Sequence, residues 1–281
     1  MKETENFSDN PISIEKTLDG LFDKFELNFD PKNLDLFTKA INHGAVPIII
    51  SNHQSLIDGV AITKVIEKVI SQVNSEKLNG FYLPYAVSIN TGDQDPFVTQ
   101  CFTSLAEKCR EKQVFLIPVV RKKDKEKYGI DEHNPLYINS QKSLKKIISL
   151  TEDKYGLAIF PEGTTQGGRL NKLGRFFGLS SADPENAVDY LIPKFIKKDI
   201  DFCVLPIGIN GSCNLFSPDT YKVGKTESNI IVNIGDVMEP RVFKDNPKFS
   251  SNTVLTNIAQ KLLQPEYVGS FFRSPQRVDL T

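Results

Sequence analysis

AVPIIIS, residues 45–51, is a short apolar run that contains three consecutive isoleucines and ends at a serine. A continuous apolar run of this length is typical of a strand buried in a largely parallel sheet. Residues 58–73 follow closely, with Ala61, Val65 and Val69 at the spacing of one helical face. The sequence therefore predicts a buried strand that leads into a helix, an arrangement typical of α/β proteins.

The rest of the chain repeats this alternation of apolar runs and helical stretches. Further strands are predicted at 114–120, 157–160, 202–209 and 230–234, and helices at 97–112, 140–151 and 186–198. Strands that alternate with helices indicate an α/β fold. We expect a mixed, largely parallel central sheet flanked by helices, with the functional residues at the ends of its strands.

The N-terminal residues do not show this alternation clearly. Phe25, Leu27 and Phe29 are interspersed with polar and charged residues, a pattern compatible with an amphipathic helix or a loosely packed arm. No repeat or low-complexity linker divides the remainder. We therefore expect an N-terminal helical arm over 1–44 and one α/β domain over 45–281.

The composition excludes several classes of protein. The chain has 281 residues with 34 Lys+Arg against 35 Asp+Glu, and this near-neutral balance argues against a dedicated nucleic-acid binder. The apolar runs are far shorter than the roughly 18 residues of a membrane span, and no signal-like segment opens the chain. Four cysteines at long spacings and three histidines without an H-E-x-x-H motif do not predict a metal centre. We expect a soluble, cytoplasmic protein without a metal.

His53 and Asp58 lie where the first predicted strand leads into its helix. A tight turn there can place the Asp58 carboxylate against one imidazole nitrogen, which fixes the tautomer and leaves the other nitrogen free to take a proton. The alternative is structural, with Asp58 as a helix N-cap and His53 as a polar loop residue. Both interpretations stay open from this segment alone.

A second group of polar residues follows the predicted strand at 157–160. There Pro161, Glu162, Gly163 and Thr164 form the sequence PEGT. Glu162 is a candidate acceptor of hydrogen bonds from substrate hydroxyls, and the amides of Gly163 and Thr164 are candidate donors, since glycine permits close backbone approach. By itself this segment is also compatible with a simple strand-to-loop turn.

Taken together, NHQSxxD at 52–58 and FPEGT at 160–164 resemble the glycerolipid acyltransferase family, which includes glycerol-3-phosphate and lysophosphatidate acyltransferases. Three weaker segments are similar to further family blocks, namely LIPVVR at 116–121, KLGRF at 172–176 and VLPI at 204–207. The likeness spans residues 53–209. It implies a fold like that of glycerol-3-phosphate acyltransferase.

The resemblance implies an O-acyltransferase. His53 would be the general base for an acceptor hydroxyl, oriented by Asp58, and the hydroxyl would attack an acyl thioester without a covalent enzyme intermediate. Glu162 would bind the glycerol backbone, Arg121 with nearby lysines would hold its phosphate, and backbone amides near His53 or Gly163 would stabilise the oxyanion. The thioester carries its own activation, so no cofactor is implied. The candidate substrate-binding residues are Glu162, Gly163, Thr164, Arg121, Lys123, Lys172 and Arg175.

The resemblance also limits the substrates. The donor would be acyl-CoA or acyl carrier protein. The long separation of the two motifs and the basic segment 121–125 are similar to soluble plastid-type glycerol-3-phosphate acyltransferases, although those have a larger N-terminal helical region. Glycerol 3-phosphate is therefore the favoured acceptor, with lysophosphatidate or another lysophospholipid as the alternative. Thr165 stands where many lysophosphatidate acyltransferases carry arginine, and Arg169, Lys172 and Arg175 are candidates to replace its charge.

Two further expectations concern partners. A cytoplasmic or plastid-stroma-like enzyme of this kind would touch a membrane surface only transiently. Phe271-Phe272 can insert shallowly, although such an aromatic pair more often pins the tail to the body of the protein. A function of another class also fits the pattern, namely a non-catalytic lipid- or acyl-carrier-binding protein on the same scaffold. The presence of both His53 and Asp58 argues against that alternative.

Overall fold

The computed structural model describes Gly20 and residues 25–55, 57–86, 96–163, 182, 186–215, 229–245 and 251–268, without the side chains of residues 96–101, 123 and 215. Within these residues the chain forms a seven-stranded sheet in the order β1-β7-β6-β2-β5-β3-β4. Its strands are β1 (Phe25–Phe29), β2 (Val46–Ser51), β3 (Gly80–Ala86), β4 (Val114–Val119), β5 (Tyr155–Ile159), β6 (Phe202–Asn210) and β7 (Ile230–Ile234).

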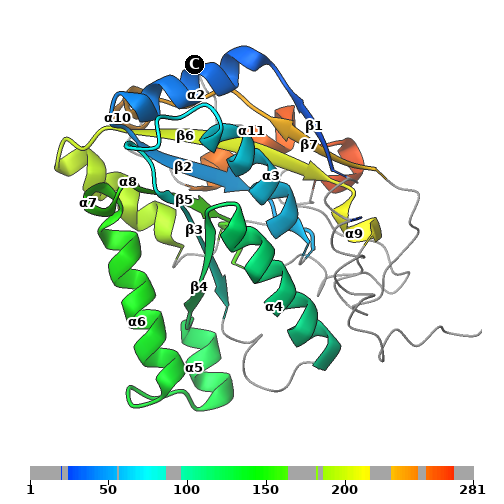
Figure 1. Ribbon diagram of the computed structural model, residues 1–281, viewed down its shortest axis with the longest axis vertical. Helices are drawn as coiled ribbons and strands as arrows, with labels where there is room; N and C mark the ends of the chain where they lie inside the picture. The colour runs from blue at the N-terminus through cyan, green and yellow to red at the C-terminus, as the bar shows by residue number, and fades with distance from the viewer. Residues whose placement is uncertain are drawn as a thin grey trace, which may run out of the picture.

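The sheet is mixed and largely parallel. Strands β6, β2, β5, β3 and β4 run parallel to one another, whereas β7 pairs antiparallel with β6 and β1 pairs parallel with β7. Figure 1 shows this twisted sheet running through the molecule with helices packed around it. The α/β fold class predicted from the sequence is therefore confirmed.

Strand β2 lies inside the sheet, between β6 and β5. All six of its residues are buried. Ile48 and Ile50 pack into the core on one face of the sheet, and Ile49 packs into the core on the other. The three consecutive isoleucines thus fill both cores from one strand, because successive side chains of a strand point to opposite faces.

Helices cover both faces of the sheet. Helices α2 (Pro31–Asn42), α3 (Asp58–Ile70) and α4 (Pro96–Glu111) pack on the face of Ile49, and α3 and α4 lie side by side in Figure 1. The opposite core contains residues of α6 (Pro135–Ile148), α7 (Leu150–Asp153), α8 (Ala187–Lys197), α10 (Pro240–Lys244) and α11 (Ser251–Lys261). The other described helical segments are α5 (Lys122–Tyr128), α9 (Ser212–Leu215) and the 3-10 turn η4 (Pro265–Tyr267).

The segment expected to be an N-terminal helical arm contributes to the sheet and the core. Phe25–Phe29 is a strand, not part of a helix, and it pairs with β7 in the register Phe25↔Ile230. Helix α2 follows, with Asp30 as its N-cap accepting a hydrogen bond from the Lys32 amide and with Phe37 fully buried. These elements are integrated with the strands that follow them.

The structure differs from the expected pattern between residues 70 and 155, where α5 was also not predicted. Strand β3, for which the sequence had no prediction, lies between β5 and β4. The helix expected over 140–151 instead begins at Pro135, where the Asn134 side chain accepts from the Leu136 amide, and it ends at Ile148 before the short α7. The N-cap and the following proline explain this earlier start.

Candidate active site

His53 follows the carboxyl end of β2, and Asp58 is the first residue of α3. The structure brings the two side chains together, with His53 Nδ1 3.0 Å from Asp58 Oδ2. The same carboxylate oxygen accepts hydrogen bonds from the amides of Gln54 at 2.6 Å and Ser55 at 2.8 Å. The N-cap position of α3 is Ile57, and these amides precede the helix, so Asp58 does not act as an ordinary N-cap.

The geometry of the pair matches that of a base and the carboxylate that orients it. The Asp58 side chain is fully buried, whereas that of His53 is 16% exposed. With Nδ1 against the carboxylate, the neutral imidazole carries its proton on Nδ1 and presents a lone pair at Nε2. Because the side chain is partly exposed, Nε2 can then take a proton from a bound group, and the buried carboxylate stabilises the imidazolium that forms.

The imidazole is also held by an aromatic ring from β5's carboxyl end. Phe160 stacks on His53 with ring centroids 4.2 Å apart and an interplanar angle of 13°. Stacking on one face and the hydrogen bond at Nδ1 restrict rotation of the ring. The orientation of the His53 side chain is therefore determined by Asp58, at the start of α3, and by Phe160, directly after β5.

Glu162 lies in the turn that follows β5. The residue is 4% exposed, and its Oε1 accepts a hydrogen bond from the His53 backbone amide at 3.1 Å. The turn closes with the Gly163 amide donating to the Phe160 carbonyl at 3.1 Å. Gly163 has φ +66°, a left-handed conformation that favours glycine and explains this residue type after Glu162.

Arg121 follows β4 and reaches the same turn. Its Nη1 donates to the Gly163 carbonyl oxygen, while Nε and Nη2 donate to the two carboxylate oxygens of Asp124 at 2.8 and 2.9 Å. Asp124 is 3% exposed, so this fork-like ion pair is held in a fixed place. A guanidinium has five N–H donors, and these contacts use three of them. The other two N–H groups of Arg121 make no hydrogen bond to the described residues.

Two residues that the sequence had not singled out anchor the turn that carries His53. Asn52 donates from Nδ2 to the Ile209 carbonyl at 2.9 Å and accepts from the Ile209 amide at 2.7 Å, which extends the pairing of β2 with β6 by one step. Gln54 accepts at Oε1 from the Gly211 amide at 3.2 Å and the Ser212 hydroxyl at 3.4 Å. In the sequence such anchors are indicated by polar residues that directly follow a predicted buried strand, because buried polar groups need hydrogen-bond partners.

The structure thus brings five of the predicted site residues to one edge of the sheet: His53, Asp58, Arg121, Glu162 and Gly163. Lys123 lies in α5, and its side chain is outside the described part of the chain. Thr164, Lys172 and Arg175 also lie outside the described residues.

The structure narrows the expectation for the oxyanion site. The amides of His53, Gln54 and Ser55 donate to Glu162 or Asp58, and the Gly163 amide donates to Phe160. Backbone amides with acceptors inside the protein are not presented to a substrate oxygen. The amides of these four residues therefore do not form the oxyanion site.

Cys213 lies near the candidate site, where the negative charge of Asp58 affects the pKa of its thiol. Burial, followed by the negative charge of Asp58, raises the pKa of the Cys213 thiol from 9.0 to about 12. The thiol therefore stays protonated at neutral pH and is a poor nucleophile. Cys213 is accordingly not the group that performs chemistry at this site.

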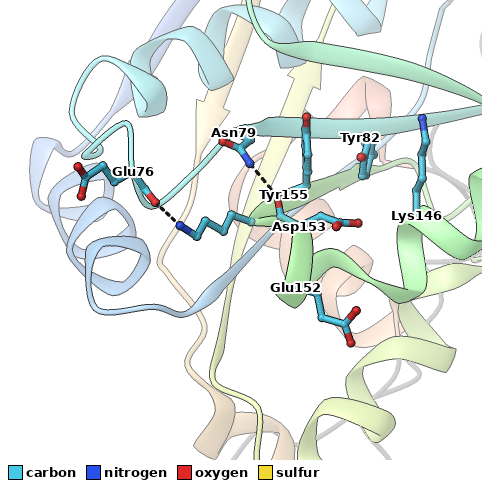
Figure 2. A pocket seen from close by; sticks show the side chains of 8 residues that line it. Glu76, Asn79, Tyr82, Lys146, Glu152, Asp153 and Tyr155 are labelled. Carbon is cyan, nitrogen blue, oxygen red and sulfur yellow. Dashed lines mark hydrogen bonds between the residues drawn. The ribbon is translucent and has the colours of Figure 1, made fainter.

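A cavity of about 700 Å³ lies at the other edge of the sheet, at the amino ends of β3 and β5 (Figure 2). Tyr82 and Tyr155 are stacked in it at 4.4 Å, and Asn79 Nδ2 donates to the Asp153 carbonyl at 2.9 Å. The remaining lining residues are Glu76, Lys146, Glu152 and Lys154. This cavity is separate from the carboxyl ends of the strands, where His53 and Glu162 lie.

We expect the protein to lose stability at high pH because buried acids resist ionisation. Burial raises the pKa of Cys109 from 9.0 to about 11 against an opposing hydrogen bond with Thr63, and burial with the nearby Tyr155 and Asp153 raises the pKa of Tyr82 from 10.0 to about 12. These groups lose protons first in the unfolded chain, so the free energy of unfolding falls between about pH 9 and pH 12. Urea unfolding at pH 8, 9.5 and 10.5 measures this fall.

The variant Cys109→Ala is the matched control for that titration. It removes one of the raised pKa values, so its free energy of unfolding should fall less steeply with pH than that of the wild type between pH 9 and 11, whatever its absolute stability. Equal slopes for the two proteins would show that the Cys109 thiol makes no pH-dependent contribution.

Further observations concern metals, membranes and related proteins. In the described ranges no group of three or more His, Cys, Asp and Glu side chains is placed to hold a metal ion, and no described helix is long and apolar enough to cross a membrane.

No protein-family model matches the sequence, and a search of curated proteins gives no significant match.

Proposed function

We propose that the protein transfers an acyl group from an acyl thioester to a hydroxyl of glycerol 3-phosphate. The observation that carries this proposal is the hydrogen bond between His53 Nδ1 and the buried Asp58, made within the segment NHQSxxD. The turn of the segment FPEGT, the other half of the acyltransferase resemblance, contacts both the backbone and the ring of His53. The two motifs thus support one site.

In the proposed reaction His53 acts as general base. Nε2 takes the proton of the acceptor hydroxyl as its oxygen attacks the thioester carbonyl, and Asp58 stabilises the imidazolium. The tetrahedral intermediate then collapses, the carbon–sulfur bond breaks, and the thiolate leaves with the proton that His53 returns. The products are an ester and a free thiol, and no covalent enzyme intermediate is formed.

Arg121 supports binding of the acceptor phosphate. Its guanidinium is held by Asp124 at the edge of the site and has two N–H donors beyond the three already used. An arginine held in this way binds a phosphate with little further loss of side-chain freedom. Lys123, Thr164, Lys172 and Arg175 remain candidates for contacts with the substrate on the grounds of the resemblance alone.

The proposal includes the substrates of the reaction and the location of the enzyme. Acyl-CoA or acyl carrier protein is the donor, and a lysophospholipid is the alternative acceptor. A cytoplasmic or stroma-like enzyme would meet a membrane transiently, when its product leaves or when a lysophospholipid enters. The proposed role is thus in phospholipid biosynthesis.

An assay of acyl transfer tests the proposal. The purified protein is incubated with palmitoyl-CoA or palmitoyl carrier protein and with glycerol 3-phosphate, lysophosphatidate or lysophosphatidylcholine; released thiol is measured, and the ester is identified by mass spectrometry. Formation of acylglycerol phosphate from glycerol 3-phosphate supports the proposal. Esters from lysophospholipids alone would move the acceptor to that class, and binding of donor without turnover would favour a non-catalytic scaffold.

A further inference from the structure

Glu162 contacts the candidate general base through the backbone of that residue. We propose that Glu162 is a positioning residue, whose carboxylate fixes the turn that carries His53, and that it is not a ligand of the acceptor. The kinetic part of this inference depends on the proposed acyl transfer, whereas the structural part does not.

The burial of Glu162 is the first observation that carries this inference. The residue is only 4% exposed, so almost none of it is accessible to a hydroxyl group that arrives from solvent. A buried carboxylate needs donors from within the protein, and the His53 amide supplies one to Oε1 at 3.1 Å. The burial of Glu162 favours an internal contact over contact with a substrate.

The second observation is that one turn holds His53 at two points. Glu162 accepts from its backbone amide, and Phe160, two residues earlier, stacks on its imidazole at 4.2 Å. Asp58 holds one of the two ring nitrogens, Nδ1. The backbone, one ring face and one ring nitrogen of His53 are therefore each fixed by a different side chain, and Glu162 is the one that fixes the backbone.

The turn that carries Glu162 is itself anchored. The Gly163 carbonyl accepts from Arg121, whose guanidinium is held by the buried Asp124. Contacts thus run from β4 to the turn after β5 and on to the residue after β2. Because β3 separates β5 from β4 in the sheet, this series of contacts joins strand ends that do not pair directly.

The experiment compares Glu162→Ala and Glu162→Gln with the wild type in two readouts. In acyl transfer, Glu162→Ala should lower kcat by about 10²-fold, the cost of a misplaced catalytic group, with the KM for glycerol 3-phosphate within about twofold of the wild type. Glu162→Gln offers a carbonyl oxygen of similar reach to the His53 amide, so it should recover most of the lost kcat.

The second readout is the tautomer of His53, measured by nitrogen-15 NMR on histidine-labelled protein, and it needs no turnover. The chain has three histidines, so the His53 signals can be assigned with the variants His43→Gln and His133→Gln. The wild type should show the tautomer protonated on Nδ1, and Glu162→Ala should change the His53 signals while Glu162→Gln leaves them closer to those of the wild type.

Asp189→Ala is the matched control. Asp189 likewise accepts a hydrogen bond from a distant backbone amide, that of Ser251 at 2.6 Å, but it joins α8 to the start of α11. It should lower the melting temperature and leave the His53 signals unchanged. An increase of KM in Glu162→Ala at constant kcat, or wild-type His53 signals in that variant, would overturn the inference. If the wild type has no acyltransferase activity, the NMR result still decides it.

Discussion

Substitution of His53 with alanine is expected to lower kcat for acyl transfer by about 10²–10⁴-fold, the usual contribution of positioned proton transfer. The reason lies in the site geometry, because the variant removes the nitrogen that accepts the hydroxyl proton and leaves Asp58 without its partner at 3.0 Å. Binding of the thioester should change little, since the imidazole is proposed to act on the hydroxyl. Initial rates at saturating donor, with circular dichroism to check the fold, measure the effect.

Two further variants test whether the loss of activity is specific to the pair His53 and Asp58. Asp58→Asn keeps the side-chain shape but offers no carboxylate to Nδ1, so it should also cause a large fall in kcat. The matched control is His133→Ala, which removes a histidine whose side chain is 89% exposed and should retain the wild-type rate. Turnover at the wild-type rate by folded His53→Ala protein would exclude the proposed general base.

Substitution of Asn52 with alanine is expected to destabilise the protein by roughly 2–6 kcal/mol. Asn52 is 1% exposed, and its side chain satisfies both the amide and the carbonyl of Ile209. Each buried backbone group left without a partner costs about 1–3 kcal/mol, and this substitution leaves two. The midpoint and slope of urea unfolding give the change in the free energy of unfolding.

The control for Asn52→Ala is Asn33→Ala, which removes an asparagine contact at the surface. Asn33 Nδ2 donates to Asp236 Oδ1 at 3.3 Å in an exposed position, so Asn33→Ala should change the free energy of unfolding by less than about 0.5 kcal/mol. A loss in Asn52→Ala no larger than that in Asn33→Ala would show that water replaces the lost contacts with Ile209. It would also show that β2 and β6 do not depend on this side chain.

The central strands could be predicted because their sequences leave few alternatives. Ile48, Ile49 and Ile50 fill cores on both sides of the sheet, and a run that is apolar on both faces fits only a buried strand of this length. The same holds for β6, all of whose residues are buried. For these strands the local pattern and the tertiary environment agree.

The strands β1 and β3 could not be predicted with the same ease. In β1, Phe25, Leu27 and Phe29 alternate with polar residues, a period of two that five residues are too few to separate from a helical face. In β3, Pro84 argues against an interior strand. The proline is tolerated because β3 pairs with β5 only from Gly80 to Tyr82, before Pro84 is reached.

The site was predictable where its contacts are local and unpredictable where they depend on strand order. His53 and Asp58 lie within one turn, so their pairing follows from the sequence spacing. The contact of Arg121 with Gly163 and that of Glu162 with the His53 amide require knowledge that the ends of β4, β5 and β2 meet. No local pattern in the sequence contains that information.

The hydrogen bonds that hold the turn of His53 have a consequence for the folding of the chain. They join residues far apart in sequence, 109 positions for His53 and Glu162 and 157 positions for Asn52 and Ile209. Contacts of such separation close large loops and form slowly. During synthesis the site cannot be complete until β6 has left the ribosome, and during refolding the recovery of activity should lag behind the recovery of helical content.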